Sequence, residues 1–117
     1  MTTTIYNNID RASGGPQFAV AVSIQLLWDS VLGPVAKVND SDTMIQGSYS
    51  TSSDENGYWE TDVIDNDSIT PSDSVYKIVE TTKSSVVSTY YISVPDAATP
   101  GPFWVGDLIV ATPDWIA

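Results

Sequence analysis

Two stretches of the chain alternate between apolar residues and polar or small ones. Side chains of a β-strand point alternately to opposite faces, so this period of two predicts strands that each bury one face. The first stretch covers residues 18–28 and the second covers residues 86–94. The β-branched content of the first favours a strand over a helix. The apolar faces consist of Phe18, Val20, Val22, Ile24, Leu26 and Trp28 in the first stretch, and of Val86, Tyr90, Ile92 and Val94, together with Ser88, in the second.

Between these stretches, residues 54–80 read as a turn, a strand, a polar loop and another strand. Asn56-Gly57 can supply the positive φ angles that a tight turn needs. Residues 58–64 are rich in aromatic and β-branched residues, which indicates an extended strand. Pro71 lies in the loop that follows, and residues 75–80 begin the next strand.

Three weaker segments complete the pattern: residues 35–38, 43–50 and 103–111. About seven short strands at this spacing are typical of an antiparallel β-sandwich. The length of 117 residues fits a single domain. The sequence therefore predicts an all-β fold, with one antiparallel β-sandwich domain of immunoglobulin-like architecture over residues 17–117.

Residues 1–16 carry little hydrophobic pattern and end in the breaker cluster Ser13-Gly14-Gly15-Pro16. We expect them to form an extended N-terminal arm, or a short edge strand, joined by a flexible hinge. Such an arm would dock on a neighbouring subunit.

The charge balance is strongly acidic, with 15 acidic residues against four basic ones and a net charge of -11. Nucleic acid and an anionic membrane surface are therefore excluded as expected partners, since both need a basic face. The acidity favours solubility, and an acidic surface that docks on a basic partner or binds cations is the alternative. The chain has no Cys and no His, which removes the commonest general base, metal ligand and thiolate nucleophile. We predict no enzyme activity, no catalytic residue and no cofactor.

Pairs of carboxylates occur in three loops, at Asp40 and Asp42, at Asp54-Glu55, and at Asp65 and Asp67. Calcium takes six to eight oxygen ligands, often from such loops. No EF-hand spacing is present, and a solvated acidic loop is the commoner outcome. We therefore predict no metal site, with calcium as the alternative.

The central unit resembles the prealbumin-like β-sandwich family, which includes the Cna B-type domains of bacterial surface proteins. The matching residues are Asn56-Gly57-Tyr58 and the strand Val75–Thr81, which contains Tyr76 and Glu80. Some members of that family form a Lys–Asn isopeptide bond assisted by a buried acid. The resemblance assigns Lys37 and Glu80 to those roles, but the last strand lacks the expected Asn. The alternative is that Glu80 is a surface residue at the end of a strand.

A closer likeness is to domains of minor tail proteins of tailed bacteriophages, and it covers roughly residues 18–112. It implies a protein of the virion. The motifs that carry it are the loop Asp67-Ser68-Ile69-Thr70-Pro71, the strand Tyr76-Lys77-Ile78-Val79-Glu80, the strand Tyr91-Ile92-Ser93-Val94-Pro95, and Asp107-Leu108.

We therefore expect a non-enzymatic structural protein on the surface of a bacteriophage particle. The expectation that this domain is the whole chain, without a fibre stalk, favours a capsid decoration protein. The alternative is a minor tail or fibre module that binds host-surface glycan. The expected partners are the major capsid protein or a tail protein of the same virion, and further copies of the chain in a homo-oligomer. Partner contact is predicted at Ile5, Tyr6, Trp59, Trp104 and Trp115.

Overall fold

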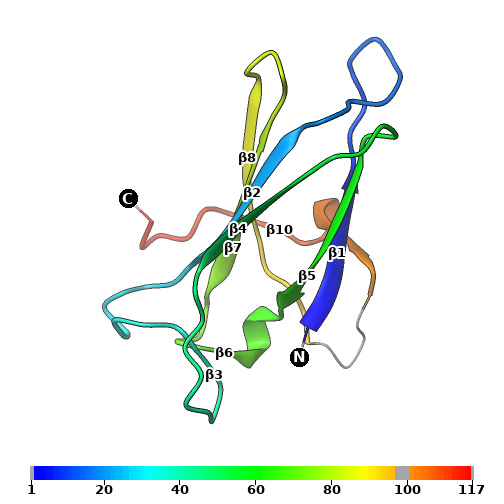
Figure 1. The fold of residues 1–117 in the computed structure, drawn as a ribbon. Coiled ribbons are helices and arrows are strands. Elements are labelled where there is room, and N and C mark those ends of the chain that lie inside the picture. The colour runs from blue at the N-terminus through cyan, green and yellow to red at the C-terminus, as the bar shows by residue number, and fades with distance from the viewer. Residues whose placement is uncertain (1, 97–100, 117) are drawn as a thin grey trace.

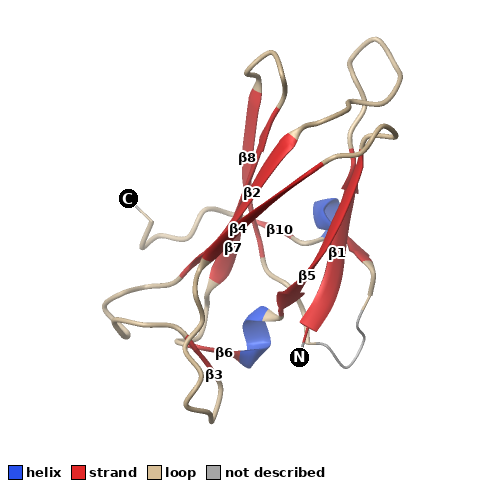
Figure 2. Ribbon diagram, in the orientation of Figure 1, coloured by secondary structure: helices blue, strands red, loops and turns tan. Residues whose placement is uncertain are grey.

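The computed structural model describes residues 2–96 and 101–116, and within them the fold is all-β without an α-helix (Figures 1 and 2). The elements, in chain order, are β1 Thr2–Asn8, β2 Ala21–Leu27, β3 Lys37–Val38, β4 Ser48–Ser52, β5 Tyr58–Ile64, the 3-10 helix η1 Asn66–Ser68, β6 Ile69–Thr70, β7 Val75–Thr81, β8 Val87–Ile92, β9 Phe103–Trp104, the 3-10 helix η2 Val105–Asp107, and β10 Ile109–Val110.

Two main sheets pack face to face in a sandwich-like arrangement. The five-stranded sheet has the order β10-β8-β7-β2-β4 and is antiparallel throughout. The three-stranded sheet has the order β5-β1-β9, with β1 antiparallel to β5 and parallel to β9. The small pair β3–β6 lies at one end of the sandwich, and the β7–β8 hairpin projects at the other end (Figure 1).

The core forms between the two sheets from alternate residues of the strands. In β2, Val22, Ile24 and Leu26 are buried while the residues between them are exposed. This confirms the face predicted from the alternation of residues 18–28, except that Phe18 lies before the strand and is exposed. Ile78 and Ile92 add to the same layer. The three-stranded sheet contributes Ile5, Trp59 and Val63 from the opposite side.

The prediction of an extended N-terminal arm was wrong. Residues 2–8 form β1, the central strand of the three-stranded sheet, and pair with β5 along the whole length of both strands. Thr3 and Ile5 are fully buried. β-Branched Thr suits a pleated, half-buried surface as well as Val does, which is why a threonine-rich segment pairs here.

The segment 103–111 forms two short strands in different sheets, where one strand was predicted. β9 joins the three-stranded sheet, η2 turns the chain, and β10 joins the five-stranded sheet. Gly106 permits this turn, because a Cβ at that position would lie 2.4 Å from the Trp104 ring. The segment predicted at 43–50 is also displaced, since β4 covers Ser48–Ser52.

The turn predicted at Asn56-Gly57 is confirmed. Gly57 has a φ of 75°, and its amide donates to the carbonyl of Asp54 at 3.0 Å. A Cβ at this position would lie 2.2 Å from the carbonyl oxygen of Ile9. The position therefore requires glycine both for its backbone angle and for the close approach of the segment that follows β1.

Candidate interaction surface

A buried carboxylate joins the two sheets through hydrogen bonds. Glu80 of β7 is 7% exposed, and its Oε2 accepts from Trp59 Nε1 of β5 at 2.8 Å and from Asn7 Nδ2 of β1 at 2.9 Å. Trp104 Nε1 in turn donates to Asn7 Oδ1 at 3.0 Å. Charge-assisted hydrogen bonds of this kind offset the cost of removing a carboxylate from water. The exposed indole of Trp104 is therefore positioned by a chain of hydrogen bonds that begins in the core.

Tyr90 of β8 lies beside the same carboxylate. Burial raises the pKa of the Tyr90 phenol, and the negative charge of Glu80 raises it further. Its hydroxyl has no hydrogen-bond partner of good geometry among the described residues. The phenol therefore stays neutral at neutral pH and adds no charge to this part of the core.

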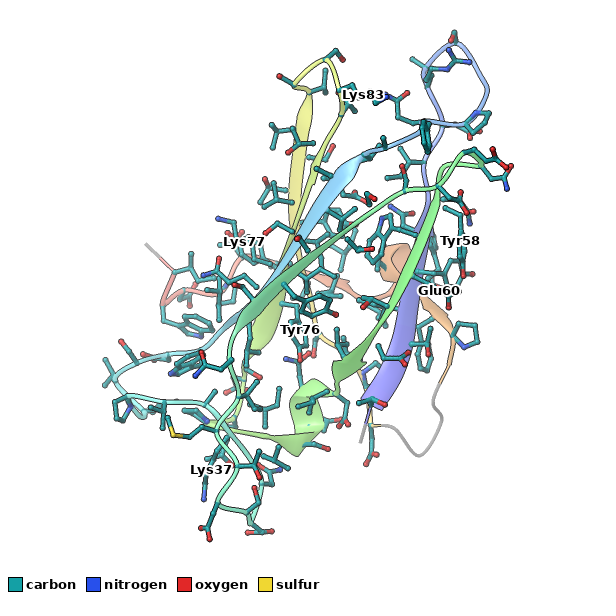
Figure 3. All side chains as sticks on the ribbon, viewed as in Figure 1. Lys37, Tyr58, Glu60, Tyr76, Lys77 and Lys83 are labelled. Atoms are coloured by element: carbon teal, nitrogen blue, oxygen red, sulfur yellow. The ribbon has the colours of Figure 1, made fainter. Side chains whose placement is uncertain are left out.

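The interpretation of Glu80 as a surface residue was wrong, because Glu80 is buried. The structure also does not join Glu80 to Lys37. Lys37 lies in β3, at the end of the sandwich that carries β6, and its Nζ donates to the carbonyl of Ser41 at 3.3 Å (Figure 3). Glu80 pairs in register with Val22, near the start of β2. The hydrogen bonds of each residue thus give it a structural role without an isopeptide bond.

The outer face of the three-stranded sheet carries aromatic and acidic side chains together. We call this the acidic face, and define it by Thr4, Tyr6, Tyr58, Glu60 and Asp62. Because Ile5 and Trp59 point into the core, their neighbours along each strand point outward. The strand register places Tyr6 opposite Glu60 and Thr4 opposite Asp62. Figure 3 shows Tyr58 and Glu60 along β5, on the side of the molecule away from the five-stranded sheet.

The two tyrosines stack at the centre of the acidic face. The ring centroids of Tyr6 and Tyr58 are 5.9 Å apart, with an angle of 29° between the ring planes. Partial burial raises the pKa of the Tyr58 phenol, and the negative charge of Glu60 raises it further. The face therefore presents two stacked phenol rings beside the exposed side chains of Glu60 and Asp62.

Hydrogen bonds fix Thr4 and Asp62 on the acidic face and tie β5 to the neighbouring sheet. Asp62 Oδ1 accepts from the Thr4 hydroxyl at 2.5 Å, and the Asp62 carbonyl accepts from the Tyr49 hydroxyl at 3.2 Å. The Tyr49 hydroxyl also accepts from the Thr61 hydroxyl at 3.0 Å. These bonds join the edge of the five-stranded sheet to β5. A surface of this kind can bind a cationic partner without first paying to order its own residues.

The five residues predicted to contact a partner are separated by the structure. Ile5 and Trp59 are in the core, so they hold the sandwich together and are not available at the surface. Tyr6 lies on the acidic face, and Trp104 is 46% exposed next to it in register. Trp115 is half-buried and lines a shallow cavity with Val75, Ser93 and Val110 at a different place.

Sequence reasoning missed Tyr58, Glu60 and Asp62 as a surface group. A signal was present, because the strand 58–64 alternates and Trp59 takes the apolar side of it. If Trp59 is assigned to the core, the period of two places Tyr58, Glu60 and Asp62 together on the other side.

Two carboxylates of the acidic loops accept hydrogen bonds from residues close to them in the sequence. Asp54 Oδ1 accepts from the amides of Asn56 and Tyr58, at 2.8 and 3.1 Å. Asp65 is fully buried, and its Oδ2 accepts from the Ser68 hydroxyl at 2.7 Å. Within residues 2–96 and 101–116, no three Asp or Glu side chains come together in a group that could hold a metal ion.

No protein-family model matches the chain, and no curated protein matches it in sequence. No helix in the described part of the chain is long and apolar enough to cross a membrane. The structure shows an all-β, sandwich-like fold, and these comparisons assign no family to the chain.

Proposed function

We propose that this chain is a non-enzymatic structural protein of a tailed bacteriophage, and that it decorates the surface of the capsid. The proposal is supported by the motif resemblance to phage minor tail domains. Two of those motifs lie on adjacent strands of one sheet, since Tyr76 and Glu80 belong to β7 and Tyr91 and Ile92 to β8. Tyr76 and Glu80 both connect the five-stranded sheet to the rest of the sandwich.

The observation that carries the proposal is the acidic face. Its stacked tyrosines provide a flat, rigid contact area, because an aromatic ring loses little conformational freedom on binding. Glu60 and Asp62 add negative charge at its edge. Such a surface is complementary to a partner that presents Lys or Arg around an apolar patch. We assign the major capsid protein of the same particle to that role.

Quantitative mass spectrometry of purified particles tests the placement. Hundreds of copies per particle, retained in tail-free capsids, are expected of a decoration protein. A handful of copies, found with the tail fraction, would move the chain to the tail or its fibres. Absence from the particle would overturn the virion proposal altogether.

Charge reversal on the acidic face tests the mode of binding. Glu60→Lys is expected to weaken the binding of the purified chain to undecorated capsids, and added salt is expected to weaken the binding of the wild type. Asp42→Lys changes the net charge equally at an exposed loop position outside the acidic face, so it is the matched control. Equal binding by both variants would refute a role for the acidic face.

The alternative is a tail or fibre module that binds host-surface glycan, and the stacked tyrosines beside carboxylates favour it. Sugar rings pack on aromatic faces while carboxylates accept their hydroxyl hydrogens. Under this alternative, host glycan quenches the fluorescence of Trp104 next to Tyr6. A signal that does not change across a panel of host glycans would leave the decoration proposal in place.

A further inference from the structure

The outer face of the five-stranded sheet carries no acidic side chain between β4 and β8. Since Val22, Ile24, Leu26, Ile78 and Ile92 are buried, the residues between them point outward. Lys77 is the charged residue among them. We call this surface the neutral face, and define it by Ala21, Ser23, Gln25, Ser48, Ser50, Ser52, Lys77, Val79, Thr81, Val87, Thr89 and Tyr91.

The neutral face ends at β8, whose outward-facing side chains are uncharged. The acids near β8 lie on its inner side, where Glu80 is buried opposite Ser88 and Asp10 lines a hollow with Val86 and Ser88. From residue 81 to residue 95 the only charged side chain is Lys83, which lies over the Phe18 ring at 5.1 Å from its centroid. Val86 and Val87 are 61% and 57% exposed. A chain of net charge -11 thus presents an uncharged, partly apolar strand at one edge.

The edge of β8 is open from residue 87 to residue 90, which is more than half of the strand. On one side, β8 pairs with β7 from Val87 to Ile92. On the other side, β10 pairs with Tyr91 and Ile92 alone. Among the described residues, nothing pairs with β8 on this side between residues 87 and 90.

The hydrogen bonds around β8 identify which backbone groups are open. The Ser93 amide donates to the Leu108 carbonyl at 3.1 Å, on the β10 side, and the Val86 carbonyl accepts from the Thr82 amide at 2.9 Å, on the β7 side. Backbone groups of successive residues in an antiparallel strand point alternately to the two sides. Val87 and Thr89 therefore direct both their N–H and their C=O groups away from β7, toward the open edge of the sheet.

We propose that this open edge pairs with the same edge of a second copy of the chain, around a twofold axis at Ser88. In that register Val87 lies opposite Thr89 of the second copy, and Thr89 lies opposite Val87 of the second copy. Each pair exchanges two hydrogen bonds, so the four open groups of each copy are all satisfied. The two five-stranded sheets become one continuous sheet, and the interface is isologous.

Charge selects a second copy as the occupant and this edge as the site. Two copies repel each other through their net negative charge, so the contact that brings them together must keep carboxylates apart. The β8 edge meets this condition, because its outward-facing side chains carry no carboxylate. Of the two edges of the three-stranded sheet, β5 carries Glu60 and Asp62, and β9 is only 2 residues long. The β4 edge is approached by β5 through the bond from Tyr49 to Asp62.

Sedimentation velocity of the full chain tests the proposal, from about 10 to about 500 µM, a range that detects weak micromolar association. The mass of one copy is 12.6 kDa. We expect a monomer–dimer equilibrium that shifts toward the dimer in 0.5 M salt, because salt screens the repulsion between the copies. A monomer at every concentration and salt level would overturn the proposal.

Thr89→Pro removes an outward N–H without removing a bond to β7, so the fold tolerates it while the dimer does not. We expect at least about tenfold weaker association. Ser50→Pro is the matched control at the opposite edge of the sheet, in β4. The Gly47 carbonyl and the Ser53 amide both bond toward β2, and backbone groups alternate along a strand, so the Ser50 amide points away from β2. An unchanged dimer in Thr89→Pro, or equal loss in both variants, would refute pairing through β8.

Amide hydrogen exchange in the wild-type chain gives a test that does not depend on a variant folding. Raising the concentration is expected to slow the exchange of the Val87 and Thr89 amides and to leave the Ser50 amide unchanged. If dimers form while the Val87 and Thr89 amides exchange at the monomer rate, the copies associate elsewhere and the proposal fails.

Discussion

Replacing Trp59 by Phe tests whether the buried carboxylate of Glu80 holds the two sheets together. The indole is 2% exposed, and its N–H lies 2.8 Å from Glu80 Oε2. Phe keeps an aromatic ring in the core but cannot donate this hydrogen bond. Glu80 then remains buried with one donor fewer, because solvent does not reach it.

Two terms set the size of the expected loss. A hydrogen bond to a charged group contributes a net of about 1.5–3 kcal/mol. The smaller ring also leaves a void, which adds about 1 kcal/mol at roughly 24 cal/mol for each Å³ that is not refilled. The free energy of unfolding should therefore fall by about 2.5–4 kcal/mol, a large part of the roughly 5–15 kcal/mol that is typical of a small domain.

Urea unfolding followed by far-ultraviolet circular dichroism measures this loss. Trp104→Phe is the matched control, because it makes the same chemical change in a side chain that is 46% exposed and bonded to Asn7. Its cost should stay below about 1 kcal/mol. If Trp59→Phe cost no more than Trp104→Phe, the hydrogen bond would not be what stabilises Glu80.

A double-mutant cycle separates the hydrogen bond from the void. Glu80→Gln keeps an oxygen that can accept from Trp59 but removes the charge. The cost of Trp59→Phe should be at least about 1 kcal/mol smaller in the Gln background, because a neutral amide loses less when a donor is removed. Equal costs in both backgrounds would assign the whole effect to packing.

Three further predictions follow from burial and backbone geometry. Ile5→Ala should lower the free energy of unfolding by about 2–5 kcal/mol in the same urea assay, because Ile5 is fully buried in β1. Tyr6→Ala on the outer face should lower it less, and equal effects would argue against β1 as a core strand. Gly57→Ala should lower the free energy of unfolding strongly, since the added Cβ would lie 2.2 Å from the Ile9 carbonyl oxygen. Gly14→Ala has a similar φ of 81° and open space around the Cβ, so it should lower the free energy of unfolding only by the backbone strain of about 1 kcal/mol. Burial, and then the charge of Glu80, raise the pKa of Tyr90 above 10.0 in the folded chain, so its contribution to stability is fully present below pH 10.0 and is lost at higher pH, where the unfolded chain ionises first. Tyr90→Phe should make the fall in stability between about pH 10 and 11 shallower, and an unchanged slope would contradict a raised pKa of Tyr90.

The sequence predicted those strands whose buried face is made of aliphatic side chains. Residues 18–28 contain Val20, Val22 and Ile24 at alternate positions, and the pattern is visible without knowledge of any neighbour. The same reasoning failed for β1, where the buried positions are Thr3 and Ile5. A hydrophobicity pattern scores Thr as polar, although its methyl group and β-branch suit a buried strand.

The acidic face follows from the alternation of β5 once Trp59 is assigned to the core, whereas the hydrogen bonds of Glu80 join residues that no local pattern connects. Asn7 and Glu80 are 73 residues apart in the sequence, and Trp59 and Glu80 are 21 apart. The alternation of β7 places Glu80 on the same face as the buried Ile78, but a glutamate is buried only where donors are available, and these donors come from the other sheet. Trp104, which was predicted as a partner contact from its place near the end of an element, is 46% exposed in the structure, and the contact itself stays a prediction.

The position of β1 between β5 and β9 has a consequence for the order of folding. Asn7 and Trp104 are 97 residues apart in the sequence, yet they lie on adjacent strands. The β7–β8 hairpin joins residues that are close along the chain, so it can form early, whereas the three-stranded sheet cannot close until residues 103–104 have been synthesised. Until then β1 pairs with β5 on one side and has no partner strand on its other side. Folding should therefore end with the capture of β9, and a nascent chain shorter than this should expose a two-stranded ribbon that chaperones can recognise.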